Sequence, residues 1–85
     1  MQELRIGKQI SMEIQRMLTK ELGDYGVSIF RTQCKEMGIK PEEIQLKDLL
    51  SLSQKMIRAL RPMMGNDRAQ KIGKEIQKFK SVVKV

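Results

Sequence analysis

The chain has 85 residues and a formal net charge of +7, with 40% hydrophobic and 32% charged side chains. A chain this short supports one folded domain, expected here over residues 1–85, and its composition is globular rather than disordered. It has no histidine and a single cysteine, Cys34, so the usual general base, the commonest metal ligand and an intramolecular disulfide are excluded.

The first element expected is an amphipathic helix that ends at Leu22. At 100° per residue its apolar side chains fall within about 160° of the helix circumference, and the charged and amide side chains lie opposite. Met12 is the large apolar residue left on the polar side, where it can mark a contact surface. The apolar set is Leu4, Ile6, Ile10, Ile14, Met17, Leu18 and Leu22.

A shorter second helix is expected after a break at Gly23, with Asp24 as its capping residue and Gly38 as its stop. An extra helical turn is predicted near residues 41–44, because Pro41 suits the first position of a helix. The inner face of the second helix is predicted to hold Val27, Phe30, Cys34 and Met37.

The third helix, expected from Leu46 to Met64, has the broadest apolar face, about 180°, and is predicted to lie at the centre of the fold. Pro62 predicts either a kink near Arg58 or an early end of this helix, and Gly65 predicts a stop. The apolar set is Leu46, Leu49, Leu50, Leu52, Met56, Ile57, Ala59, Leu60, Met63 and Met64.

A fourth helix is expected to be capped by Asn66 or Asp67. Its apolar stripe spans only about 80° with the alternating three and four spacing of a helix seam. Gly73 inside this helix favours close approach of a neighbouring helix, the alternative being a tolerated surface glycine. Residues 81–85 are expected to be a frayed tail. The stripe consists of Ala69, Ile72, Ile76, Phe79 and Val83.

These patterns predict an all-α fold, a compact bundle of four main helices joined by short turns, with no transmembrane segment. The positive charge is unevenly placed, because seven basic and seven acidic side chains balance over residues 1–45, whereas residues 46–85 hold ten basic and three acidic ones. This basic C-terminal half suggests an anionic partner.

Nucleic-acid binding is therefore one functional hypothesis for this small basic protein. The basic faces of the third and fourth helices would merge if the two form an antiparallel hairpin, and they would then contact duplex phosphates. The alternative is that these side chains are only a solvated surface. The candidate residues are Lys47, Lys55, Arg58, Arg61, Lys71, Lys74, Lys78 and Arg68.

Protein interaction is the preferred hypothesis, with a homodimer as its simplest form and a methionine-lined groove for a partner helix as another. No catalytic residue, cofactor or metal site is predicted, because no nucleophile with a base, phosphate loop or ligand spacing occurs. Cys34 is expected to be inert, and a cytoplasmic location is expected from the lone cysteine and the absence of a signal segment. The candidate interface residues are Met56, Met63, Met64, Ile72, Gly73, Ile76, Phe79 and Val83.

Overall fold

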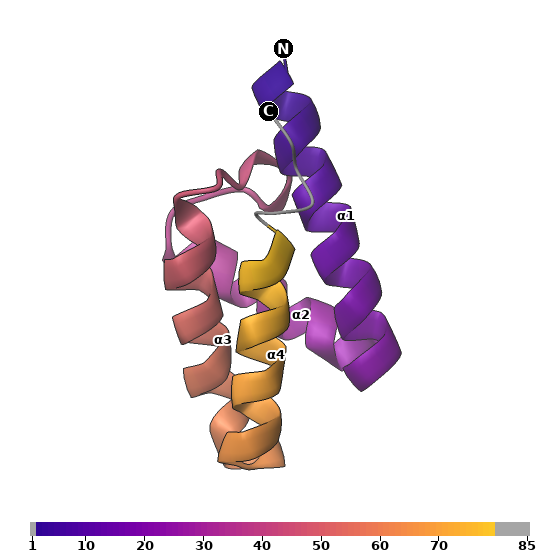
Figure 1. Cartoon of the computed structure of the whole chain (residues 1–85), viewed down its shortest axis with the longest axis vertical. Helices are drawn as coiled ribbons and strands as arrows, with labels where there is room; N and C mark the ends of the chain where they lie inside the picture. Colours follow the sequence, from indigo (N-terminus) through magenta and orange to yellow (C-terminus); the bar gives the residue numbers. More distant parts are fainter. Residues whose placement is uncertain (1, 80–85) are drawn as a thin grey trace.

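The structure, a computed structural model, describes the backbone of residues 2–79 and the side chains of residues 7–79. Helices account for its regular elements, with no strand between residues 2 and 79, and this confirms the predicted all-α class (Figure 1). Val83 and the predicted tail at 81–85 lie outside the described residues. The elements are α1 (Gln2–Leu22), α2 (Asp24–Glu36), the 3-10 turn η1 (Pro41–Glu43), α3 (Asp48–Met64) and α4 (Asn66–Lys78).

The helices form two sequential pairs, and the loop that carries η1 connects them (Figure 1). Helices α3 and α4 run antiparallel and pack along their length, while η1 packs against α1. Helix α2 packs against α1 within its own pair and against α3 of the other pair. The central position predicted for the third helix is therefore shared with α2. Helices α1 and α4 do not pack against each other along their length. No helix within the described residues is long and apolar enough to cross a bilayer.

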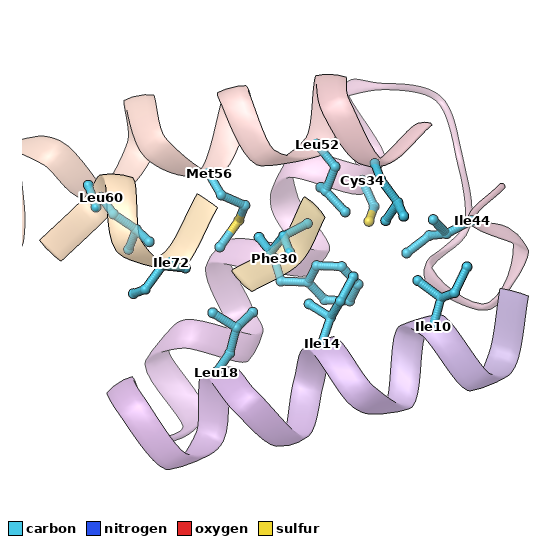
Figure 2. Close-up of a cluster of buried hydrophobic side chains, with 13 residues drawn as sticks. Ile10, Ile14, Leu18, Phe30, Cys34, Ile44, Leu52, Met56, Leu60 and Ile72 are labelled. Atoms are coloured by element: carbon cyan, nitrogen blue, oxygen red, sulfur yellow. The ribbon is translucent and has the colours of Figure 1, made fainter. Parts of the chain in front are cut away.

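One apolar core joins all four helices and the η1 loop. Figure 2 shows Ile10, Ile14 and Leu18 projecting from α1 into the same cluster as Phe30 of α2 and Met56 of α3. Phe30 is the largest of the fully buried side chains, so it anchors the two pairs to each other. The other buried apolar residues are Cys34, Ile44, Leu49, Leu52, Leu60, Ala69, Ile72 and Ile76.

In two helices the N-cap residue is a glycine rather than the predicted polar residue. Gly23 and Gly65 precede α2 and α4 with φ values of 69° and 84°, a backbone conformation that favours glycine. Each helix therefore starts on the next residue, and neither makes a side-chain capping hydrogen bond. The capping roles predicted for Asp24 and for Asn66 or Asp67 are wrong, since all three lie inside the first turn.

Of the predicted C-terminal helix ends, the stop of α2 at Gly38 is confirmed, whereas the early end of α3 at Pro62 is not. Helix α2 ends in a Schellman motif, in which the Gly38 N–H bonds to the Lys35 carbonyl and the Ile39 N–H to the Cys34 carbonyl, both at 3.0 Å. Helix α3 continues through Pro62 to Met64, so the early end was wrong. Pro62 lies in the last turn with its ring exposed, where a missing N–H removes a single helical bond.

The close helix approach predicted from Gly73 is confirmed. A Cβ at this buried position would lie 2.5 Å from Ile57 Cγ1 and would also overlap Ile57 Cδ1. The absence of a side chain on α4 therefore leaves the space that Ile57 of α3 occupies. Gly7 has the same role on α1, since a Cβ there would overlap the backbone carbonyl of Glu42 in η1.

Candidate functional site

The basic side chains of α3 and α4 border two different grooves rather than one. Seven of the eight predicted nucleic-acid contacts are exposed, and Lys55 is half-buried. Arg68 and Lys71 line a groove beside α1, whereas Arg58 and Arg61 line a second groove between α3 and α4. Lys47, Lys55, Lys74 and Lys78 line neither groove. Each groove therefore holds two of the eight predicted contacts.

The first surface, which we name the α1/α4 groove, exists because these two helices are not packed against each other. It has a volume of about 490 Å³. Four apolar residues line it, of which Ile72 is buried and the others are partly buried against the core. Exposed or half-buried charged side chains surround them. The apolar lining is Met17, Met64, Ile72 and Phe79, and the charged rim is Glu13, Arg16, Lys20, Glu21, Arg68, Lys71 and Glu75.

Part of the charged rim is neutralised within the chain. Arg16 pairs with Glu13 and Lys78 with Glu75, each at 3.2 Å between nitrogen and carboxylate oxygen. Lys20, Arg68 and Lys71 have no ion pair or side-chain hydrogen bond to any other described residue. Because Glu21 is the one rim carboxylate outside these pairs, the unpaired charge of the rim is positive.

The second surface, the α3/α4 groove, has a volume of about 500 Å³ and no carboxylate in its lining. Gln77 Nε2 donates to Ser53 Oγ at 3.0 Å, and Ser53 Oγ donates to the Leu50 carbonyl at 2.7 Å, so one groove amide is held by α3. Arg58 and Arg61 make no ion pair or side-chain hydrogen bond within the described residues. The lining is Gln54, Ile57, Arg58, Arg61, Gln70 and Gln77.

The residues predicted as a partner interface lie mostly inside the chain. Four of them are buried, because the apolar stripe of α4 and the face of α3 pack into the chain's own core. They are Met56, Ile72, Gly73 and Ile76, and apart from Ile72, which borders the α1/α4 groove, none lines either groove. The predicted residues that keep exposed surface are Met63, Met64 and Phe79.

Sequence reasoning missed the contribution of α1 to a binding surface. Met17 was assigned to the apolar face of the first helix, and the charged side chains of that helix, which include Lys20, were assigned to the opposite face. The structure places both on the α1/α4 groove. The helix faces on which the two residues lie were predicted correctly. The groove between α1 and α4, where they line the same surface as Phe79, could not be predicted, because the apolar pattern of one helix does not show how two helices are arranged.

Two other polar side chains, Cys34 and Tyr25, lie outside both grooves. Cys34 is fully buried, and burial, together with the negative charges of Asp48 and Glu42, raises the pKa of its thiol to about 11. The thiolate is therefore scarce near neutral pH. Tyr25 and Met63, both about half exposed, meet through a contact of 3.2 Å from the Tyr25 hydroxyl to Met63 Sδ. This pair joins the start of α2 to the end of α3.

Within the part of the chain that the structure describes, no three potential metal-binding Cys, Asp or Glu side chains lie together. The side chains that line the two grooves offer apolar contact, charge and hydrogen bonding. Comparison of the chain with protein-family models, curated proteins and solved structures gave no match.

Proposed function

We propose that the chain is a non-catalytic protein-interaction module that binds an acidic amphipathic helix of a partner protein in the α1/α4 groove. The single observation that carries the proposal is the combination of an apolar lining with a rim whose unpaired charge is positive. An amphipathic helix would place its apolar stripe on the lining and its carboxylates against the rim.

The dimensions of the groove suit a short helix. Its lining on α4 runs from Arg68 to Phe79, which is about 17 Å along the helix axis at 1.5 Å per residue. A partner helix of about three turns has the same length. Met17 and Met64 have flexible thioether side chains, which can adapt to the shape of such a helix.

The charge of the chain favours an acidic partner over a second copy. Each copy has a formal net charge of +7, so two copies repel at low salt, whereas an acidic helix is attracted. Helix docking also leaves Met56 and Ile76 in the core, where they are fully buried. The homodimer expected from the sequence stays a prediction, which sedimentation equilibrium at several salt concentrations would test.

A cytoplasmic location is part of this proposal. The one cysteine is free and buried, which is compatible with a reducing compartment.

The proposal can be tested with a displayed library of amphipathic helical peptides selected on the purified chain. Enriched peptides should share apolar residues at helical spacing and an excess of Asp and Glu. Their affinity should fall at least about tenfold in the exposed rim variant Arg68→Gln/Lys71→Gln, because two unpaired cations are lost. Met64→Ala should also weaken binding, since it removes part of the apolar lining.

The matched control is Arg58→Gln/Arg61→Gln, which removes the same charge from the other groove. It should leave the peptide affinity within about twofold, because distant exposed charges are screened by salt. Enrichment of no helical peptide would contradict the proposal, as would peptides that bind both double variants equally well. Circular dichroism of each variant verifies that the helices remain folded.

A further inference from the structure

We infer that the α3/α4 groove is a separate surface that binds the phosphate backbone of a nucleic-acid duplex. The inference goes beyond helix docking, because its residues lie outside the α1/α4 groove. Arg58 and Arg61 line this groove and were predicted from the sequence as nucleic-acid contacts, whereas Arg68 and Lys71 line the α1/α4 groove.

The lining of the α3/α4 groove has the donors that phosphate oxygens accept. Arg58 and Arg61 stand one turn apart on α3, both exposed and both without an ion pair in the described chain. A guanidinium can donate two parallel hydrogen bonds to one phosphate. The three glutamine amides of the lining add neutral donors, and Gln77 is oriented by its bond to Ser53.

The face around the groove extends this cationic surface. Lys47 adjoins the first turn of α3 with a helical backbone conformation, and it lies three turns before Arg58 on the same side of the helix. Lys74 neighbours Gln70 and Gln77 on α4, since residues three and four apart are adjacent on a helix. From Lys47 to Arg61 the distance along α3 is about 21 Å, which equals about six base pairs of duplex.

Duplex binding fits this face better than binding of single strands. Recognition of single strands relies on exposed aromatic rings on which bases stack. Phe30 is fully buried, Phe79 borders the α1/α4 groove, and the exposed Tyr25 contacts Met63. No ring lines the α3/α4 groove. Contacts to phosphates with little reading of sequence are therefore expected.

The test is fluorescence anisotropy with a labelled duplex DNA of about 20 base pairs and mixed sequence, titrated with the full chain between 25 and 200 mM NaCl, conditions chosen on the order of physiological salt and below. If Lys47, Arg58, Arg61 and Lys74 each neutralise one phosphate, log affinity should fall against log salt with a slope of about −3.6. A duplex RNA and a single-stranded DNA of the same sequence serve as further probes.

The decisive comparison is between two variants of equal charge. Arg58→Gln/Arg61→Gln should reduce the slope by about 1.8 and weaken duplex binding at least about tenfold at low salt. Arg68→Gln/Lys71→Gln removes the same charge beside α1 and should weaken binding less than about threefold. Both changes are at exposed residues without described partners, so far-UV circular dichroism should be unchanged.

Preferential loss in the Arg58/Arg61 variant supports the inference, and the DNA and RNA duplexes then show which sugar the surface accepts. Three results would overturn it. The first is no binding to either duplex at about 25 mM NaCl, where phosphate contacts are strong. The second is an equal loss of duplex affinity in the two variants, and the third is tighter binding of the single strand than of either duplex.

Discussion

Substitution of Gly73 by alanine tests the close approach of α3 and α4 that shapes the α3/α4 groove. On an isolated helix this change would stabilise by about 1 kcal/mol, because glycine is the weaker helix former. In the folded chain the added Cβ would lie 2.5 Å from Ile57 Cγ1, well inside contact distance, and would overlap Ile57 Cδ1 as well. The two effects therefore have opposite signs.

The overlap should outweigh the gain in helix propensity. Ile57 cannot move only its terminal methyl group, because its Cγ1 is also too close and a β-branched residue in a helix has one strongly preferred χ1 rotamer. Overpacking of this kind costs about 1–3 kcal/mol. After subtraction of about 1 kcal/mol for propensity, Gly73→Ala should lower the free energy of unfolding by about 1 kcal/mol.

The assay is urea unfolding followed by circular dichroism, in the native background and in Ile57→Ala. The second background removes both overlapping carbons, so Gly73→Ala should there raise the free energy of unfolding by up to about 1 kcal/mol. The interaction energy between the two sites should then be about 1–3 kcal/mol. Equal stabilisation by Gly73→Ala in both backgrounds would refute the close approach.

Three further changes can be measured by the same unfolding experiment. Gly7→Ala should lower stability by about 2 kcal/mol, more than at the α3–α4 contact, because the obstacle is the η1 backbone rather than a side chain; a gain in stability would contradict this packing. Cys34 has its folded pKa raised from 9.0 to about 11, so the unfolded thiol ionises first and the stabilising effect of burial, complete below pH 9.0, is lost as the pH rises toward 11. The native chain should thus lose stability relative to Cys34→Ala between about pH 8 and about pH 10, which is about one unit on either side of the unfolded pKa. Parallel plots of unfolding free energy against pH for the two chains would disprove the raised pKa of Cys34. Ser53→Ala should cost about 1 kcal/mol by removing the acceptor for Gln77, with the exposed Ser51→Ala as control, and equal effects would mean that the bond adds nothing.

Helical periodicity, together with the positions of glycine and proline, predicted the helices of this fold. The positions of Ile10, Ile14 and Leu18 placed one face of α1 in the core, and Gly38 and Gly65 marked helix ends. The caps were harder to predict, because Asp24 has a suitable side chain but Gly23 already occupies the cap position with a positive φ. Local composition does not show which of two adjacent candidates the backbone uses.

The binding surfaces could not be predicted to the same extent. An apolar stripe such as Ile72 and Ile76 shows that a face is covered, but not whether the chain itself or a partner covers it. The direction of Arg58 and Arg68 on their helices was also correct, yet their separation into two grooves depends on how α4 is rotated between α3 and α1. Such packing brings together residues far apart in the sequence, as the close approach of Gly73 to Ile57 illustrates.

The most direct test of helix docking is to map backbone amide shifts by NMR while a selected acidic helical peptide is added to the isotope-labelled chain. The α1/α4 groove predicts the largest shifts at residues 13–21 and 68–79, where its lining lies on α1 and α4. Residues 54–61, which line the other groove, should change little. Largest shifts along 54–61, or around the Tyr25–Met63 contact, would contradict the proposed docking site.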